Sequence, residues 1–119
     1  MAGRRSLLVL GALLAALGIA LGAFGAHALK AVLSPQALGW WDTAVQYQMW
    51  SAIGLVALSA ARRPMRVPGL LIAAGSIVFA GSLYVMALAD LRWLGAVTPV
   101  GGALMIAGWL LAAWNALRA

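Results

Sequence analysis

Few side chains in this sequence can carry acid–base chemistry or bind a ligand. The 119 residues include one histidine, His27, and two acids, Asp42 and Asp90. His27 closes a long apolar stretch, and an ionisable residue at membrane depth is a candidate for proton handling or ligand binding. The competing interpretation, which we favour, is an interfacial histidine that hydrogen-bonds a loop carbonyl.

A second group of polar side chains follows His27 along the chain. Asp42, Gln46 and Tyr47 are predicted to meet His27 near the outer membrane face, and Tyr84 is predicted near the same face. Such a cluster would bind a polar lipid headgroup, a quinone carbonyl or a small solute. Hydrogen bonds between helices, worth about 0.6 kcal/mol each in a membrane, explain the same residues without a ligand. We favour this second interpretation.

Several classes of function conflict with the composition. Without cysteine and with a single histidine, the chain offers no usual zinc site. It has no phosphate-binding loop and no Ser/His/Asp arrangement, so we expect no metal, no other cofactor and no enzyme. The net charge of +6 comes from basic residues that lie between apolar segments. This pattern is typical of a membrane protein rather than of a nucleic-acid-binding surface.

Apolar segments supply the framework for these side chains. Hydrophobic residues make up 66% of the chain and charged residues 8%, whereas about a quarter of a typical soluble domain is charged. We predict an all-α membrane protein: a single domain, 1–119, folded as a compact bundle of four transmembrane helices. The spans are predicted at about 7–28, 43–61, 69–89 and 95–117. Each is long enough to cross a hydrocarbon core of about 30 Å.

Two connections allow alternative interpretations. Ser34 and Pro35 are typical of a helix start, and residues 35–41 are predicted to form a short amphipathic helix on the outer face, with Trp41 at the headgroup level. Trp40 is predicted at the headgroup level as well. The same residues would also suit the flared start of the second span. Thr98 and Pro99 either cap the true start of the fourth span, which leaves residues 94–97 irregular, or interrupt that span.

Small residues recur at helical spacing in three of the predicted spans. Smooth faces of this kind let neighbouring helix backbones approach each other in lipid. We predict helix packing along these positions: Gly11, Ala15, Gly18, Gly22, Gly25, Gly69, Ala73, Ser76, Ala80, Gly101 and Gly108. In the second span, the face predicted to look into the protein consists of Thr43, Gln46, Tyr47, Trp50, Gly54 and Ala57.

Charged residues indicate the topology. With the N-terminus inside, six arginines lie on the inner side and only Lys30 and Arg92 on the outer side. The positive-inside rule then places both termini in the cytoplasm. A cleaved signal peptide is the alternative interpretation of the first span, since Ala26-His27-Ala28 resembles a cleavage site. Its apolar run is longer than the roughly 7–15 residues of a signal core, which favours retention.

Four motifs in this order resemble a known family. They are GAFGAHAL (22–29), W-x-T-A-x-x-Y-Q (41–48), G-S-L-Y (81–84) and V-T-P-V-G-G (97–102). The chain resembles the domain-of-unknown-function 423 family, small four-span proteins of bacterial inner membranes with mitochondrial relatives. The resemblance implies a multi-pass protein of the bacterial inner (plasma) membrane but no activity. In that family a second histidine often follows the Y-Q-x-aromatic stretch, but in this sequence Ser51 occupies that position. A mechanism that needs two histidines is therefore not expected.

Three functions are compatible with these residues. The scarcity of ionisable groups favours a non-catalytic protein, an accessory subunit or assembly factor that contacts membrane lipids and another membrane protein or a second copy of itself. The alternative is a binder or carrier of a lipid, quinone or small solute at His27, Asp42, Gln46 and Tyr47. An intramembrane enzyme is the least favoured, because the only acid and base available to it are Asp42 and His27.

Overall fold

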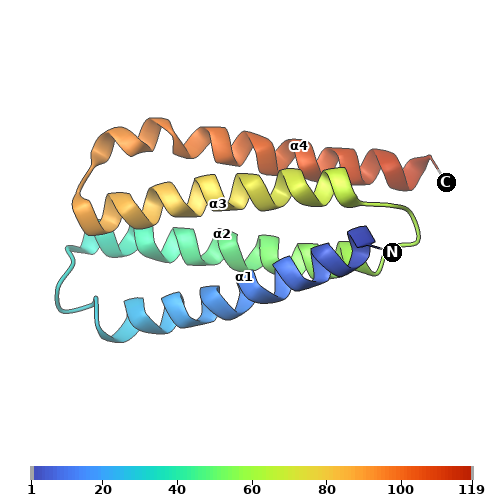
Figure 1. The fold of residues 1–119 in the computed structure, drawn as a ribbon. Helices are drawn as coiled ribbons and strands as arrows, with labels where there is room; N and C mark the ends of the chain where they lie inside the picture. The colour runs from blue at the N-terminus through green and yellow to red at the C-terminus, as the bar shows by residue number, and fades with distance from the viewer. Residues whose placement is uncertain (1, 119) are drawn as a thin grey trace.

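The computed structural model describes residues 2–118, which form four α-helices and one short 3-10 helix (Figure 1). The elements are α1 (Ala2–His27), α2 (Pro35–Ser59), α3 (Arg66–Ala89), the 3-10 helix η1 (Arg92–Ala96) and α4 (Thr98–Leu117). Proline breaks helix interiors, and within these helices it occurs only in first turns, at Pro35, Pro68 and Pro99. The prediction of an all-α fold is confirmed for the described residues.

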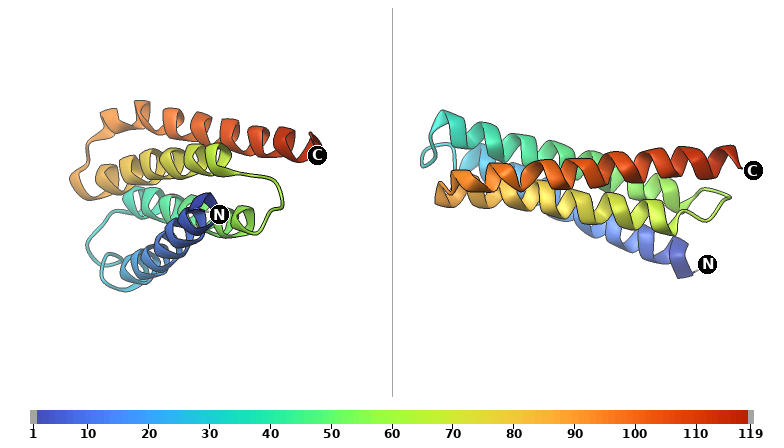
Figure 2. Two further views of the ribbon diagram at one scale, coloured as in Figure 1. Left: turned by 45° about the vertical axis from the view of Figure 1, so that its right-hand side comes forward. Right: turned by 90° about the horizontal axis from the view of Figure 1, so that it is seen from above.

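Consecutive helices run antiparallel and lie side by side in chain order, so that α1 and α4 occupy opposite edges (Figures 1 and 2). α2 packs against α1 and α3, and α3 packs against α2 and α4. The molecule measures 50 × 26 × 18 Å. Half of the apolar stretch of α3 is buried, but less than a quarter of that of α1 or of α4. The core therefore follows α2 and α3, and the two outer helices expose broad apolar faces.

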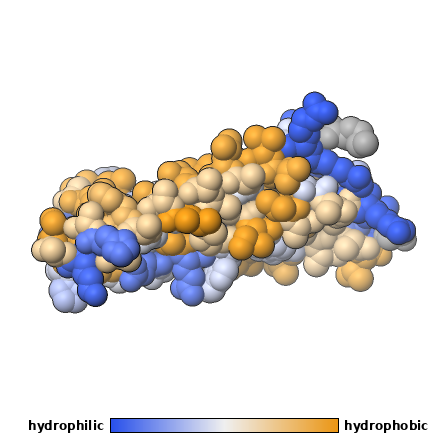
Figure 3. Space-filling model, turned by 90° about the horizontal axis from the view of Figure 1, so that it is seen from below, coloured by the Kyte–Doolittle hydropathy of each residue, from blue (hydrophilic) through white to orange (hydrophobic). Residues whose placement is uncertain are grey.

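In the described part of the chain, three segments are long and apolar enough to cross a membrane: Gly3–His27, Arg66–Ala89 and Arg92–Leu117, the last of which joins η1 and α4. α2 has 25 residues, but Asp42, Gln46 and Gln48 lower its mean hydropathy. Figure 3 shows hydrophobic residues over most of the middle of the molecule and hydrophilic residues at its two ends and along part of its lower edge.

The separate helix predicted at residues 35–41 is not present. These residues form the first two turns of α2, which continues without a break to Ser59. The Ser34 hydroxyl caps the helix by accepting a hydrogen bond from the Ala37 amide at 3.1 Å. Gly39 weakens the helix by only about 1 kcal/mol, and the burial of Ala37 and Trp41 outweighs that cost. The alternative interpretation, in which 35–41 begin the second long helix, is the correct one.

The inward face predicted for α2 is wrong at most of its positions. Gln46, Tyr47, Trp50 and Ala57 are exposed, and the buried face consists of Ala37, Trp41, Ala44, Gln48, Ser51, Ala52, Gly54 and Leu55. Gln46 and Gln48 are two residues apart and so point about 200° apart around a helix. Only one of the two glutamines can therefore face the interior, and the hydrogen-bonding partners of Gln48 decide which.

α4 begins at Thr98, with Pro99 in its first turn, and the residues before it form the regular turn η1. The Thr98 hydroxyl does not cap α4. Its oxygen lies 2.6 Å from the Ser82 hydroxyl oxygen and 3.2 Å from the Leu94 carbonyl oxygen. When Thr98 donates its one proton to Leu94, it accepts from Ser82. Thr98 therefore ties the start of α4 to α3, and Pro99 does not interrupt the helix.

Candidate functional site

The structure does not gather the predicted polar residues into one cluster. His27, Asp42 and Gln46 are exposed, and the hydrogen bonds of the described residues do not join them to one another. Tyr47 lines a groove between α2 and α4, with its ring against Phe79 of α3 at a centroid distance of 4.7 Å. Tyr84 lines a different hollow, between α1 and α3. The two tyrosines are therefore on different faces of the molecule.

A buried polar chain crosses from α3 through α2 to α1. The Tyr84 hydroxyl donates to Gln48 Oε1 at 2.6 Å, and Gln48 Nε2 donates to the main-chain carbonyl of Leu14 at 2.9 Å. Trp41 makes a parallel contact, in which Nε1 donates to the Leu21 carbonyl at 2.8 Å. The Trp41 and Tyr84 rings lie 4.6 Å apart. These bonds satisfy polar groups that would be costly in hydrocarbon and hold three helices together.

Glycines of α1 expose the two carbonyls that receive these bonds. In an α-helix, the carbonyl of one residue points towards the residue four positions later, and those positions are Gly18 for Leu14 and Gly25 for Leu21. A Cβ atom on Gly25 would lie 2.5 Å from Trp41 Nε1, and one on Gly18 would lie 3.4 Å from Gln48 Nε2. The absence of a side chain at both positions therefore lets the α2 donors reach the α1 backbone.

A repeat of seven residues in the sequence is the signal from which this contact could have been predicted. Trp41 and Gln48 are seven residues apart, which is two helical turns, so they lie on one face of α2. Leu14 and Leu21 show the same spacing on α1, as do Gly18 and Gly25. Matching repeats on two neighbouring helices indicate a paired contact. Trp41 was expected to face the membrane interface, but its side chain is buried between helices. Its depth at the headgroup level stays a prediction.

The most aromatic surface lies on the other side of α2. A groove of about 310 Å³ separates α2 from α4, and it is lined by Tyr47, Trp50, Ser51, Phe79, Gly102, Met105, Ile106 and Trp109; we call it the aromatic groove. Trp50 is 56% exposed and Trp109 is 42% exposed. The Trp109 ring rests on Gly54, and the Ser51 hydroxyl donates to the Met105 sulfur at 3.4 Å.

A smaller hollow of about 170 Å³ lies between α1 and α3, and Gln48 of α2 is one of its lining residues. Three leucines of α1 form one wall, and Ser76 and Tyr84 of α3 supply hydroxyl groups on the other. The Ser76 hydroxyl is buried and has no hydrogen-bond partner. Among the described residues, no group of three or more His, Cys, Asp or Glu side chains is placed to hold a metal ion.

Comparison with known proteins identifies the family. The family model described as "Protein of unknown function (DUF423)" matches residues 21–102, from the last turns of α1 to the first turns of α4. The chain belongs to the DUF423 family. The resemblance drawn from the four sequence motifs is thereby confirmed, and the matched region includes Trp41, Gln48 and Tyr84.

Several curated DUF423 relatives are similar over most of their length. The UPF0382 membrane protein SH2409 of Staphylococcus haemolyticus is 42% identical over 108 residues, which is 87% of this chain and 88% of the relative. The UPF0382 membrane protein YwdK of Bacillus subtilis is 40% identical over 87% of this chain and 89% of its own. The UPF0382 inner membrane protein YgdD of Escherichia coli K12 is 36% identical over 96% of this chain and 91% of the relative. No solved structure matches.

Proposed function

We propose that this DUF423 protein is a non-catalytic protein of the bacterial inner membrane that crosses the bilayer four times and associates with another membrane protein through the aromatic groove. The name of the Escherichia coli relative supports the location. Both termini would lie in the cytoplasm. Three features support the proposal: the packing of α2, the placement of the titratable groups and the position of two tryptophans.

The packing of α2 supports a fourth span. Its 25 residues extend about 37 Å, enough to cross a bilayer core of about 30 Å. The helix lies between α1 and α3, both of which are apolar enough to cross. Its buried glutamine, Gln48, is hydrogen-bonded at both ends of its amide group. Arginine then concentrates at the end of the bundle that holds both termini (Figure 1), which by the positive-inside rule is cytoplasmic.

The titratable groups support a non-catalytic role. General acid–base catalysis needs an acid or base held within hydrogen-bond reach of the reacting atoms. His27 and Asp42 are exposed, and Asp90 forms an exposed ion pair with Arg92 at 3.3 Å. The polar side chains Gln48 and Tyr84 already bond each other inside the bundle.

The observation that carries the proposed association is the position of Trp50 and Trp109. Trp50 lies nine residues before the end of α2, and Trp109 lies eight residues before the end of α4. At the rise of an α-helix, both would lie about 13 Å from the cytoplasmic ends of their helices. Tryptophan is enriched at membrane–water interfaces, where its indole N–H finds a partner. The hydrogen bonds of the described residues include none from either indole. Aromatic and methionine side chains are enriched in protein interfaces, so a helix of a partner that seats in this groove would cover both rings.

Crosslinking in native membranes tests the association. The chain has no cysteine, so a single introduced thiol can carry a benzophenone group at a chosen position. Ile106 lines the aromatic groove and is 63% exposed, so Ile106→Cys places the benzophenone in the groove. Ile19 of α1 is 65% exposed and lies outside the groove, so Ile19→Cys is the control position. We expect a discrete crosslinked product from the first variant only. No product from Ile106→Cys, or the same products from both variants, would contradict the proposal.

A second candidate function is favoured by the unpartnered Ser76 hydroxyl. Ser76 lines the hollow between α1 and α3, where a carbonyl of a lipid or quinone would accept its hydrogen bond. Native mass spectrometry of the protein extracted from its own membrane would show a retained ligand that is lost in Ser76→Ala. Ser59→Ala is the control, because that hydroxyl bonds its own helix at Val56. A protein that retains no ligand would exclude this function.

A further inference from the structure

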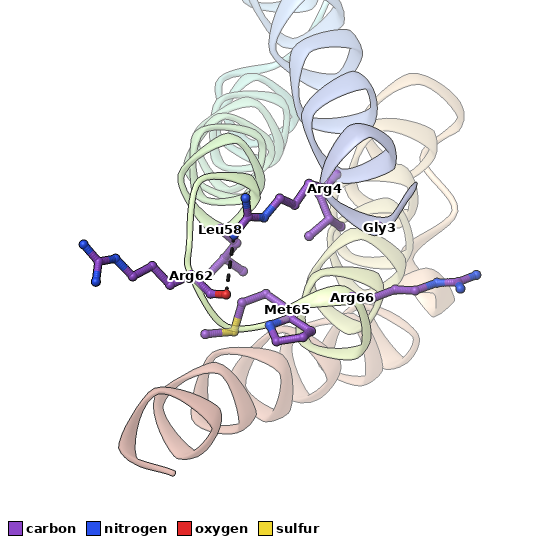
Figure 4. A pocket seen from close by; sticks show the side chains of 8 residues that line it. Gly3, Arg4, Leu58, Arg62, Met65 and Arg66 are labelled. Atoms are coloured by element: carbon purple, nitrogen blue, oxygen red, sulfur yellow. Dashed lines mark hydrogen bonds between the residues drawn. The ribbon is translucent and has the colours of Figure 1, made fainter. Parts of the chain in front are cut away.

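A pocket opens at the arginine-rich end of the bundle, between the first turns of α1 and the segment that joins α2 to α3 (Figure 4). Its volume is about 400 Å³, and it is lined by Gly3, Arg4, Leu7, Leu58, Arg62, Pro64, Met65 and Arg66. This size falls within the range of about 300–1,000 Å³ that is usual for small-ligand sites.

The lining divides into a basic rim and an apolar floor. Leu7 and Met65 are buried in the core that α1 shares with α2 and α3. Arg62 and Arg66 are exposed, and Figure 4 shows their side chains extending from opposite sides of the mouth. Arg4 reaches across the pocket towards the α2–α3 segment (Figure 4). A ligand that matches this lining has an anionic head and an apolar continuation.

Within residues 2–118, no acidic side chain forms an ion pair with an arginine of this rim. Arg4 donates to the main-chain carbonyl of Ala61 at 2.7 Å, and a second contact to the Arg62 carbonyl measures 3.4 Å. Neutral carbonyls leave the guanidinium charge in place. Both acids of the chain, Asp42 and Asp90, lie towards the other end of the bundle, near the start of α2 and at the end of α3.

We infer that this pocket binds the phosphate of an anionic phospholipid. Arginine pairs with phosphate through two parallel N–H···O bonds, and basic pockets between transmembrane helices on the cytoplasmic side suit anionic headgroups. Arg62 and Arg66 would turn onto the phosphate from either side of the mouth while Arg4 holds the base of the headgroup. The first acyl carbons would follow Leu7 and Met65. This inference shares the membrane placement of the proposed function but not the aromatic groove.

Native mass spectrometry of the full-length protein tests the site. The protein would be offered equal amounts of phosphatidylglycerol and phosphatidylcholine of the same acyl chains. We expect phosphatidylglycerol to be retained preferentially. The double substitution Arg62→Gln with Arg66→Gln should lower that preference by about thirtyfold, because each arginine near an anionic surface contributes about fivefold. Inorganic phosphate in excess should leave the bound lipid in place.

The matched control is Lys30→Gln with Arg92→Gln, which removes two positive charges at the opposite end of the bundle and should leave the preference unchanged. Equal loss in both double variants would show a general charge effect and overturn the site. Displacement of the lipid by inorganic phosphate would show a simple anion site and would also overturn it. The unaltered protein supplies a second measurement, since phosphatidylglycerol should raise its Tm above the value in phosphatidylcholine, and equal Tm values would contradict the inference.

Discussion

The α1–α2 and α3–α4 interfaces both use glycine, but most of the glycines admit different atoms. At the α1–α2 interface, Gly18 and Gly25 make room for the side chains of Met49, Gln48 and Trp41, whereas Gly11 also meets a main-chain atom, the Ala52 carbonyl oxygen. At the α3–α4 interface, Gly75 and Gly101 face each other through main-chain atoms. A flexible side chain can move away from an added methyl group, whereas two helix backbones cannot separate locally. Gly18 and Gly25 should therefore tolerate substitution better than Gly75 and Gly101.

The largest effect is expected at the α3–α4 interface. A Cβ atom on Gly101 would lie 2.6 Å from the Gly75 carbonyl oxygen and would also meet the Phe79 backbone. We expect Gly101→Ala to lower the free energy of unfolding by about 3 kcal/mol, because overpacking here must move a helix. The measurement is unfolding in mixed detergent micelles.

Gly102→Ala is the control for that substitution. An added Cβ atom there meets only the Phe79 ring, at an ordinary contact distance of 3.8 Å. Alanine is about 1 kcal/mol better than glycine in a helix, so this neighbour should be neutral or slightly stabilising. Equal losses for Gly101→Ala and Gly102→Ala would show that the close backbone contact is not what holds α3 to α4.

A smaller loss is expected at the α1–α2 interface. Alanine at Gly25 would push the Trp41 indole away from the Leu21 carbonyl, and we expect the free energy of unfolding to fall by about 1–2 kcal/mol. Trp41 fluorescence cannot be separated from the other five tryptophans, so the readout is again unfolding in micelles. Gly81→Ala, where an added Cβ atom meets nothing within 4 Å, should lose nothing. A loss at Gly25 as large as at Gly101 would remove the proposed contrast.

The smallest effect concerns the polar chain alone. A double-mutant cycle with Tyr84→Phe and Gln48→Leu isolates the hydrogen bond between the Tyr84 hydroxyl and Gln48 Oε1. We expect a coupling free energy of about 0.6 kcal/mol, the average for such bonds in membranes. Additive effects of the two substitutions would mean that this bond contributes nothing to the stability of the bundle.

The sequence predicted the helices well because their signals are local. Apolar runs, basic residues between them and proline in first turns act within a few residues, and they predict an all-α fold whose helices match those observed. Four short motifs were enough to predict the family that the comparisons confirm. The start of α2 was harder to predict, because Gly39 and two tryptophans resemble an interfacial segment until the burial of Trp41 is known.

The candidate site could not be predicted to the same degree, because it depends on which helix faces meet. The polarity of Gln46 and Gln48 is equal, and only the Leu14 carbonyl and Tyr84 decide that Gln48 is buried. Likewise, Gly75 did not belong to the predicted packing stripe, although it makes a close backbone contact with Gly101. A pattern along one helix shows which residues share a face but not what that face contacts.

The central claim is that α2 crosses the membrane and that the arginine-rich end lies in the cytoplasm. Lys30 and Arg62 flank α2 on either side and are both exposed, and the chain has no cysteine to compete with an introduced one. A membrane-impermeant maleimide applied to spheroplasts should label Lys30→Cys but not Arg62→Cys, and inverted vesicles should give the opposite result. Labelling of both positions from the same side would show that α2 does not cross and would contradict the claim.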